Sequence, residues 1–465
     1  MDREKTVRPF GWRDKVGYMF GDFGNDFTFL FASTFLMIFY TKVLGISMGL
    51  VGTLFLTARC IDAFTDVTMG RIVDRMNPKK DGRFRPWLRR MCAPVAISSF
   101  LMYQSSLAGA SMTVKVIYMF VTYILWGSIF YTSINIPYGS MASVLSADSD
   151  DRAALSTYRS VGATLAGLII GVGGPMLVYT TDAAGNQLVH GPRFTLIAGI
   201  FSLGAIGCYL LCYFMTTERV KIAPTHHEEQ VSFKETVKAL VSNRALLGII
   251  AAAILLLLAS LMTQSVNQYV FVDYFKNKEA LAVMSIAGIL PMLLMAPFTV
   301  PITRKYGKKE VGAVGCILGG IASLLMFVLQ VKSAAVYIAI SVIGYFGFGF
   351  FNLIIWAFIT DIIDDQEVRT GKREDGTIYA VYSFARKIAL SGGLGAYALA
   401  LVGYDSSVQV QTAEVAGGIY NVATLVPGIL YIGVGLCLIF IYPLNKKKVE
   451  GNIAILKERR EVNYE

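Results

Sequence analysis

The chain has 465 residues, of which 55% are hydrophobic and 16% are charged. Soluble proteins carry about 25% charged residues, so this composition excludes an ordinary soluble enzyme and indicates a membrane protein with many spans. The net charge is +10, but the Lys and Arg residues lie between apolar blocks, where they set membrane topology, so nucleic acid is not an expected partner.

Apolar blocks of about 20 to 30 residues, each long enough to cross a bilayer, follow one another along the chain. Charged residues, Pro and Gly separate them into twelve predicted transmembrane helices. The first six cover residues 16–42, 49–75, 86–107, 113–146, 150–179 and 194–217, and the second six cover 244–273, 281–303, 310–330, 333–363, 376–404 and 415–443. We therefore predict an all-α membrane protein with two six-helix bundles, at 1–217 and 244–443, a linker at 218–243 and a tail at 444–465.

Lys and Arg are concentrated in the loops on the side of both termini, so the positive-inside rule predicts that both termini are cytoplasmic. The first fifteen residues lack the apolar core of a removable signal peptide. The largest basic loops follow the second and the eighth span, at corresponding places in the two halves. This weak internal repeat is similar to the plan of the major facilitator superfamily, whose substrate site lies near the midplane between the halves.

Charged residues inside the second span are the first candidates for function, because a charge at the bilayer centre costs about 2.5 to 3.5 kcal/mol on insertion scales. In LTARCIDAFTDVTMGRIVDR, Asp62 and Asp66 are four residues apart and Arg59 precedes Asp62 by three, so all three share one helix face. Such oxygen ligands, with Thr65 added, suit Na⁺, whereas a proton needs only one carboxylate. Both coupling ions stay open, as does a purely structural pairing of Arg59 with an aspartate.

The first and fourth spans carry the groups that a sugar needs, because sugars present hydroxyl rims and apolar C–H faces. Asp22 and Asp26 are aligned on the first span, although Asp22 stands near one end of it. In FYTSINIPYGSMA, Pro137 bends the fourth span where hydroxyl, amide and aromatic groups gather, namely Thr132, Asn135 and Tyr138. An alternative role for Asn135 is a hydrogen bond between helices.

Cations on the fifth and eleventh spans are candidates to neutralise these carboxylates or an acidic substrate. YAVYSFARKIAL places Ser383 and Lys387 four residues apart, with Arg386 adjacent, and the fifth span carries Arg159. An alternative for Arg159 is a side chain that reaches the cytoplasmic surface.

Charged loop residues on the cytoplasmic side form a candidate gate between the halves, although a simple orientation signal explains them equally well. They are Asp74, Arg83, Arg85, Asp151, Arg152, Asp361 and Asp364.

Nothing in the sequence predicts catalysis. The three histidines, His190, His226 and His227, lie in predicted loops, and no Ser/His/Asp set, cysteine–histidine pair or metal motif lies at membrane depth. We therefore expect no enzyme activity, no cofactor and no bound metal beyond a transported Na⁺.

Several motifs distributed over nearly the whole chain are specific to one family. They are GYMFGDFGNDF at 17–27, RCIDAFTDVTMGRIVD at 59–74, GRFRPW at 82–87, NIPYGSMA at 135–142, DRAALSTYR at 151–159 and GTIYAVYSFARK at 376–387. The chain resembles the glycoside-pentoside-hexuronide:cation symporters of the major facilitator superfamily, and it is closer to the glucuronide carriers of that family than to its melibiose permeases.

The resemblance implies roles for individual residues. Asp62 and Asp66, with Thr65, would form the cation site, Asp26 with Arg159 would contribute to the sugar site, and Lys387 would lie between the two. Melibiose permeases have an aspartate and a tryptophan where this chain has Asn135 and Gly139, which argues against melibiose and, together with Arg386, favours an acidic sugar.

The expected function is import of a glycoside, pentoside or hexuronide sugar coupled to Na⁺ or H⁺, by a multi-pass protein of the bacterial inner membrane acting as a monomer in the lipid bilayer. Two alternatives are a lysolipid or other small-molecule carrier with the same fold, and a sugar receptor that does not transport. Polar groups in spans one, four and eleven count against the first alternative, and paired intramembrane aspartates count against the second.

Overall fold

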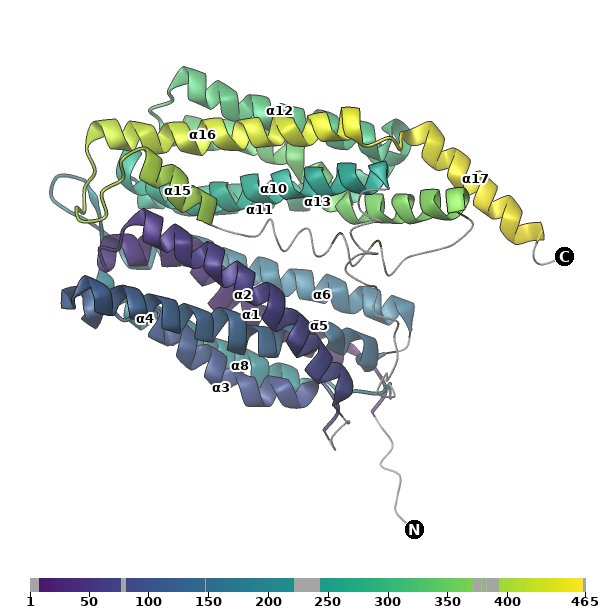
Figure 1. Cartoon of the computed structure of the whole chain (residues 1–465), viewed down its shortest axis with the longest axis horizontal. Coiled ribbons are helices and arrows are strands. Elements are labelled where there is room, and N and C mark those ends of the chain that lie inside the picture. Colours follow the sequence, from purple (N-terminus) through teal and green to yellow (C-terminus); the bar gives the residue numbers. More distant parts are fainter. Residues whose placement is uncertain are drawn as a thin grey trace, which may run out of the picture. The chain divides into compact units, whose positions relative to one another are not determined.

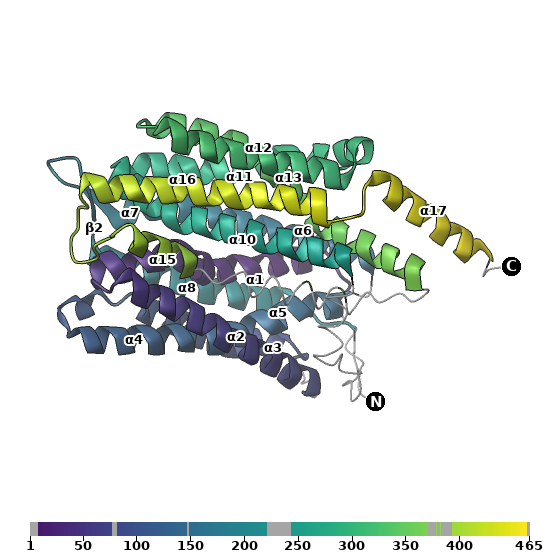
Figure 2. The same ribbon diagram turned by 45° about the horizontal axis from the view of Figure 1, so that its top comes forward.

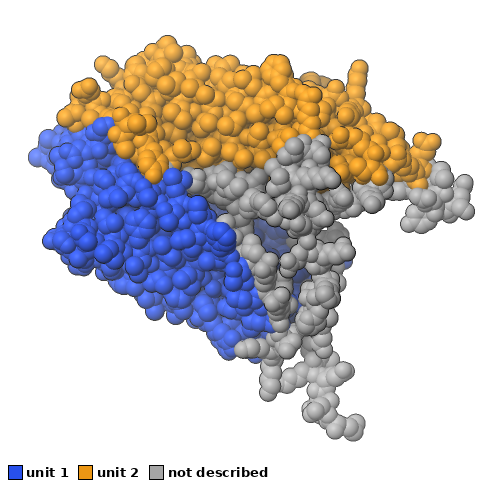
Figure 3. Space-filling view, viewed as in Figure 1, with its two compact units in different colours: residues 1–228, 403–411 blue, residues 229–402, 412–465 orange. Residues whose placement is uncertain are grey.

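The computed structural model describes the chain apart from residues 1–7, 77–80, 147, 221–242, 371–377, 379–381, 383–392 and 463–465. The chain divides into two compact units, which Figure 3 colours separately: residues 1–228 with 403–411, and residues 229–402 with 412–465. The division after residue 228 falls inside the predicted linker at 218–243, most of which lies outside the described residues.

Unit 1 is built from the helices of the first six predicted spans (Figure 1). In chain order they are α1 (Trp12–Phe31), η1 (Ala32–Leu36), η2 (Phe39–Val43), α2 (Met48–Arg75), α3 (Arg85–Leu101), η3 (Ser105–Gly109), α4 (Met112–Ile124), η4 (Leu125–Tyr131), α5 (Thr132–Leu145), α6 (Ser149–Leu168), η5 (Ile169–Gly173), α7 (Gly174–Val178) and α8 (Gly191–Met215). The fourth span is thus one continuous rod, α4–η4–α5, whose central turn is a π-helix. Such wide turns are frequent at functional sites.

A short hairpin between the fifth and sixth spans was not predicted. Strands β1 (Tyr179–Thr181) and β2 (Gln187–Val189) are antiparallel, with Thr180 opposite Leu188. Asp182 accepts hydrogen bonds from the backbone amides of Ala184 and Asn186, and Gly185 adopts a φ of +83°. Asp, Asn and Gly residues favour tight turns, so the sequence does contain a signal for this hairpin turn.

Unit 2 holds the last six spans and a helix in the tail (Figure 2). In chain order its helices are α10 (Arg244–Tyr269), η6 (Val270–Tyr274), α11 (Lys278–Tyr306), α12 (Lys308–Leu329), α13 (Ala334–Thr370), α15 (Gly393–Leu401), α16 (Ala413–Leu436), η7 (Cys437–Ile441) and α17 (Lys446–Val462). Helix α13 continues seven residues beyond the predicted end of the tenth span, so the acidic residues expected in a loop there, Asp364 among them, lie on a helix. The tail also forms a helix, α17, which was not predicted.

Nine helices in the described part of the chain are long and apolar enough to cross a membrane. The other three predicted spans are not among these nine helices, and each has an identifiable reason. The first carries Asp22 and Asp26 within its length, the third is the 17-residue helix α3, and the eleventh is described mainly over Gly393–Leu401.

Glycines on α1 and α6 allow the helices of unit 1 to approach closely, and α1 packs against both α6 and α8. A Cβ atom on Gly24 would lie 2.8 Å from Cys208 Cβ of α8, and a Cβ atom on Gly162 of α6 would lie 2.5 Å from the carbonyl oxygen of Met19. These contacts leave no room for larger side chains, which explains the small residues of GYMFGDFGNDF. They also fix the position of α6, and with it Arg159, beside α1.

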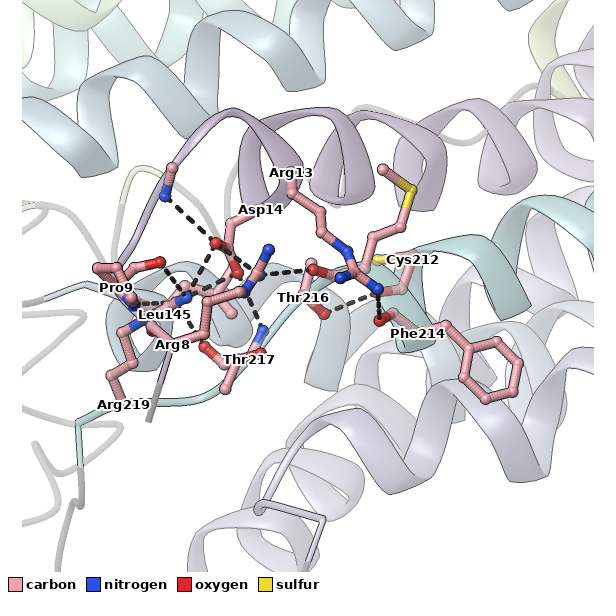
Figure 4. Close-up of polar contacts among 12 residues, drawn as sticks. Arg8, Pro9, Arg13, Asp14, Leu145, Cys212, Phe214, Thr216, Thr217 and Arg219 are labelled. Atoms are coloured by element: carbon pink, nitrogen blue, oxygen red, sulfur yellow. Dashed lines mark hydrogen bonds and ion pairs between the residues drawn. The ribbon is translucent and has the colours of Figure 1, made fainter. Parts of the chain in front are cut away.

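A buried carboxylate, Asp14, joins the start of α1 to the end of α8 (Figure 4). It is fully buried and pairs with Arg219 at 2.9 Å and with Arg8 at 2.8 Å, and it accepts a hydrogen bond from the backbone amide of Thr217. Arg219 also donates to the carbonyl oxygen of Leu145 at the end of α5. Three helix ends are therefore held together at one point.

The neighbouring residue, Glu218, caps the start of α3. Its carboxylate accepts hydrogen bonds from the backbone amides of Arg83, Phe84 and Arg85 at 2.7, 2.9 and 2.8 Å. Amides at a helix start lack partners within the helix, so the carboxylate satisfies them. Gly82 has a φ of +111°, and a Cβ atom there would overlap the Glu218 carboxylate. The glycine is thus required both by the backbone and by the close approach.

Residues 403–411 belong to unit 1, although the helices before and after them belong to unit 2. They contact the end of the first span, where the buried Lys42 donates to the carbonyl oxygen of Gln409 at 2.9 Å. The Gln409 side chain donates in return to the carbonyl oxygen of Lys42 at 2.8 Å. Within residues 403–411, the side-chain amide nitrogen of Gln411 donates a hydrogen bond to the carbonyl oxygen of Asp405.

The tail helix α17 is docked on α13 through a buried acidic residue, Asp365. Asn452 donates to Asp365 at 3.1 Å, and Lys448 lies 3.7 Å from it. Arg459 donates to the carbonyl oxygens of Glu367 and Val368 near the end of α13. Cations and amides thus satisfy the last turns of α13, where the helix dipole favours positive charge.

Candidate functional site

The predicted cation site is formed by α2 and the fourth span. Ser128 of η4 donates a hydrogen bond to one carboxylate oxygen of Asp62 at 2.5 Å, and Arg59 donates to the other at 3.0 Å. One turn along, the hydroxyl of Thr132 lies 3.0 Å from a carboxylate oxygen of Asp66. Two carboxylates and two hydroxyls therefore converge between these helices, which is a donor set that suits a hard monovalent cation.

The pairing of Arg59 with Asp62, expected as the structural alternative, is present in the structure. The Arg59 Nη1 and Asp62 Oδ2 atoms are 3.0 Å apart in this pair. The formal charges of Arg59, Asp62 and Asp66 sum to −1, which one monovalent cation would balance. Thr65 donates to the carbonyl oxygens of its own helix, Ile61 and Asp62, rather than to a carboxylate, so its role as a cation ligand stays a prediction.

A second charged cluster lies between α1 and α6. Arg159 Nε donates to Asp22 Oδ1 at 2.9 Å, and its guanidinium carbon lies 5.4 Å from the ring centroid of Tyr138. The Asp22 side chain is 9% exposed and that of Arg159 is 41% exposed. Arg159 is therefore directed toward α1 and does not extend alone to the surface. The tight contact of Gly162 with Met19 brings it there.

Asp26, four residues along α1 from Asp22, is half-buried. Among the residues that the structure describes, no hydrogen bond or ion pair to its carboxylate is found, although its charge interacts with those of Asp22 and Arg159. Four lone-pair positions are thus available to a ligand, and hydroxyl groups of a sugar are donors of the right kind. The formal charges of Asp22, Asp26 and Arg159 sum to −1.

Asn25 connects three helices next to Asp26. Its side-chain nitrogen donates to the hydroxyl of Tyr131 at 2.8 Å and to Asn135 Oδ1 at 3.4 Å. Its side-chain oxygen accepts a hydrogen bond from the hydroxyl of Tyr209 of α8 at 3.1 Å. Asn25 is 5% exposed, so this amide is a buried junction of α1, the fourth span and α8.

Two residues predicted to contact sugar have structural partners here. Asn135 makes the hydrogen bond between helices that was the alternative interpretation. Tyr138 is 1% exposed; its ring stacks on that of Tyr18 at 4.7 Å, and its hydroxyl donates to the Tyr18 carbonyl oxygen. In this structure Tyr138 supports Arg159 and offers no surface to a ligand. Thr132, also predicted for sugar, donates a hydrogen bond to Asp66, and its contact with sugar stays a prediction.

The cations of the eleventh span cannot be placed, because Ser383, Arg386 and Lys387 lie outside the described residues. The same holds for the side chains of two residues of the predicted gate, Asp74 and Arg152.

The remaining gate residues have contacts inside their own unit. Arg83 donates to the carbonyl oxygen of Val73, and Arg85 donates to that of Tyr213. Asp151 accepts from Ser146, and Asp361 pairs with Lys308 at 2.6 Å. Asp364 is half-buried on α13. A gate of ion pairs between the halves stays a prediction.

Sequence reasoning missed Ser128 and Asn25. Ser128 precedes Thr132 by four residues, so the spacing rule that aligned Asp62 with Asp66 also places these hydroxyls on one face. Asn25 stands between two aspartates, and a polar amide inside an apolar span is itself a signal of an interhelical contact. The partners of Asn25 cannot be predicted from spacing, because they are about 110 to 185 residues away in the sequence. The same holds for Glu218, whose partners are about 135 residues away.

Comparison with known proteins gives consistent results. Residues 17–446 match the model of a family described as MFS/sugar transport protein. An uncharacterized symporter of Bacillus subtilis, YjmB, is 31% identical over 96% of this chain and 95% of its own length. The glucuronide carrier protein homolog of Escherichia coli K12 is 31% identical over 98% of each chain.

The fold also matches solved structures. The crystal structure of a D-xylose-proton symporter superposes with a TM-score of 0.65, covering 94% of this chain and 98% of that one, at 12% sequence identity. This likeness, together with the family match, confirms the predicted all-α architecture of the major facilitator superfamily.

Proposed function

Because this chain belongs to the family of MFS/sugar transport proteins, we propose that it is a secondary active transporter that imports an acidic sugar together with one Na⁺ or H⁺. The prediction that it is not an enzyme is confirmed by the family. The observation that carries the proposal is the presence in unit 1 of two clusters, each with a formal charge of −1, one around Asp62 and Asp66 and the other around Asp22 and Asp26.

The cation would bind between Asp62 and Asp66. Ser128 and Thr132 add hydroxyl oxygens to this set, and Arg59 limits its net charge to −1. Since an uncompensated charge in the membrane is costly, a bound cation lowers the energy of closing the site off from water while the carrier changes conformation. An empty site would retain its negative charge.

The sugar would bind beside Asp26 and Arg159. The Asp26 carboxylate, which has no hydrogen-bond partner among the described residues, would accept sugar hydroxyls, and the Arg159 guanidinium would bind a carboxylate of the substrate in a bidentate manner. The described cluster alone is anionic, so an acidic sugar needs positive charge from other residues, and the sequence offers Arg386 and Lys387 as candidates. The printed name of a relative, glucuronide carrier protein homolog, supports an acidic substrate of the hexuronide type.

One cation per sugar is energetically sufficient. Moving a positive charge through 100 mV releases about 2.3 kcal/mol, and a tenfold cation gradient adds about 1.4 kcal/mol, which together sustain several-hundredfold accumulation of a neutral sugar. With a monoanionic sugar the cation and the sugar together carry no net charge across the membrane, so transport is electroneutral and only the cation gradient drives uptake. Acidic sugars should therefore be accumulated independently of membrane voltage.

The remaining features of the proposal concern the setting of the protein. The distribution of Lys and Arg supports cytoplasmic termini in a bacterial inner membrane. Arg83, Arg85, Asp361 and Asp364 would then lie on the cytoplasmic side. Both polar clusters are formed within unit 1 of a single chain, so a monomer would be sufficient for transport.

Uptake into proteoliposomes tests the proposal. Purified protein would be given labelled glucuronate or a glucuronide, with a neutral glucoside as the comparison, under an inward Na⁺ gradient or an inward proton gradient. We expect uphill uptake of the acidic sugar with one of the two gradients, stopped by the matching ionophore. Accumulation that persists without either gradient would contradict symport, and binding without counterflow would indicate a receptor.

A further inference from the structure

We propose that Asn25 is a positioning residue that couples the cation site to the sugar site through the fourth span. The inference rests on the proposed function and adds to it the route by which one ligand affects the other. The supporting observation is that four polar residues lie within two turns of the fourth span, and that successive ones contact the cation site and the sugar-site helix in turn.

The alternation is visible in the contacts. Ser128 and Thr132 contact Asp62 and Asp66 of α2. Tyr131 and Asn135, the neighbours on the adjacent face, both accept hydrogen bonds from the side chain of Asn25 on α1. A single helical segment therefore touches the cation aspartates on one face and the sugar-site helix on the other.

Thr132 provides a physical means by which a cation would change this segment. Its hydroxyl lies 3.0 Å from Asp66 Oδ1 and 3.2 Å from the carbonyl oxygen of Gly127, but it has only one proton to donate. With Asp66 ionised and the site empty, the proton is directed to the carboxylate. When a cation binds, the hydroxyl oxygen faces the cation and its proton turns to Gly127.

This second partner lies inside the π-helical turn, Leu125–Tyr131, whose last residue is Tyr131. A π-turn has a wider hydrogen-bond pattern than an α-helix and is a place where the helix register can adjust. A new hydrogen bond to Gly127 therefore acts on the same turn that positions the Tyr131 hydroxyl against Asn25.

The position of Asn25 allows a movement of the π-turn to affect the residues that would bind the substrate. Asn25 precedes Asp26 directly in α1 and follows Asp22 by three residues, so a movement of its side chain affects the helix turn that carries both aspartates. Asn25 also accepts a hydrogen bond from Tyr209 of α8. Among the described residues, Tyr209 makes no hydrogen bond to Ser128 or Thr132, the fourth-span residues that contact the cation-site aspartates. Tyr209 is thus an anchor and not part of the route.

The asymmetry between Tyr131 and Tyr209 supplies the test. Both hydroxyls bond to Asn25, at 2.8 and 3.1 Å, but only Tyr131 belongs to the fourth span. The quantity to measure is the ratio of sugar Kd values without and with saturating cation, using glucuronate or the glucuronide that the wild type binds. The Kd of the cation alone is measured in parallel through its effect on thermal stability.

We expect Tyr131→Phe to reduce this ratio at least threefold toward one while the cation Kd without sugar stays within about twofold, because the cation ligands are untouched. Asn25→Ala should reduce the ratio at least as much. Tyr209→Phe, the matched control, should keep the wild-type ratio even where it lowers thermal stability. If Asn25→Ala does not fold, the two tyrosine variants decide the question.

Two outcomes would overturn the inference. One is a wild-type ratio in both Tyr131→Phe and Asn25→Ala. The other is an equal loss in Tyr131→Phe and Tyr209→Phe, which would mean that the junction only supports the fold. Failure of the proposed function is distinguishable, because the wild type itself would then show a ratio of one with every cation, and the coupling route would fall with it.

Discussion

The hydroxyl of Thr132 lies 3.0 Å from a carboxylate oxygen of Asp66, and through this contact the fourth span reaches the acidic face of the second. Replacing Thr132 by Val keeps the shape of the side chain but removes the hydroxyl. We expect the cation affinity to fall about tenfold, which is the usual scale for losing one oxygen from a metal site or its supporting shell. Sugar binding titrated with Na⁺, and separately with pH, measures the effect.

Thr132→Ser retains the hydroxyl and serves as the control. It should bind the cation within about twofold of the wild type, since only a methyl group is lost. Equal cation affinities in the Val variant and the wild type would exclude Thr132 from the site.

The ion pair between Asp22 and Arg159 predicts a pattern of stabilities in three variants. Arg159→Gln leaves the Asp22 carboxylate, which is 9% exposed, without its partner and should destabilise the protein by about 1 to 3 kcal/mol. The double variant Asp22→Asn with Arg159→Gln should recover part of this loss, because no uncompensated charge remains. Thermal unfolding in detergent provides the comparison.

Sugar binding should behave differently from stability in these variants. If Arg159 binds the substrate carboxylate, the double variant regains stability without regaining affinity for an acidic sugar. Recovery of both together would mean that the pair only holds α1 to α6.

Gly162 predicts a packing effect on the sugar site. In Gly162→Ala the new Cβ would lie 2.5 Å from the Met19 carbonyl oxygen, so α6 must move away from α1. Overpacking of this kind costs about 1 to 3 kcal/mol. We expect a lower melting temperature and weaker sugar binding, because Arg159 lies one turn away on the same helix.

Gly207→Ala on α8 is the matched change, because a Cβ atom there meets nothing within 4 Å. It should leave stability and binding close to those of the wild type. Unchanged sugar affinity in Gly162→Ala would show that the contact of α6 with α1 does not set the position of Arg159.

Glu218 predicts a structural effect away from the ligand sites. Glu218→Gln keeps the size of the side chain but replaces an ionised acceptor of three backbone hydrogen bonds by a neutral one. Charge-assisted bonds are about twice as strong as neutral ones, so we expect a loss of about 1 to 2 kcal/mol in stability.

Thermal unfolding of Glu218→Gln is best compared with that of Glu279→Gln, which changes an exposed acidic residue in the first turn of α11. Equal melting temperatures in the two variants would mean that the cap on α3 contributes nothing measurable. Sugar affinity should be unchanged in both, since neither residue touches the clusters of unit 1.

The spans and the acidic face of α2 could be predicted from the sequence, because both depend on local patterns. Apolar length fixes where a helix crosses the membrane, and a spacing of four residues fixes that Asp62 and Asp66 share a face. The resemblance to a known family assigned Arg159 to the sugar site, which stays a prediction; the structure pairs Arg159 with Asp22.

What spacing could not supply is which of several polar residues on one helix faces a ligand and which faces a neighbouring helix. Asn135 and Tyr138 are three residues apart, yet one bonds to Asn25 and the other is packed on Tyr18. Their orientation depends on the approach of α1, which Gly21 allows: a Cβ atom there would overlap the Tyr138 ring. Contacts of this kind depend on tertiary packing and not on local pattern.

The central claim is that Asp62 and Asp66 bind the coupling cation, and the sugar affinity of the two Asn variants tests it most directly. Sugar Kd values of wild type, Asp62→Asn, Asp66→Asn and the exposed control Glu414→Gln would be measured with and without saturating Na⁺ and at two pH values. The claim predicts that the cation no longer improves sugar affinity in either aspartate variant and still does so in the control. Exchange of sugar across the membrane should persist in both aspartate variants. Full stimulation in Asp66→Asn would contradict the claim.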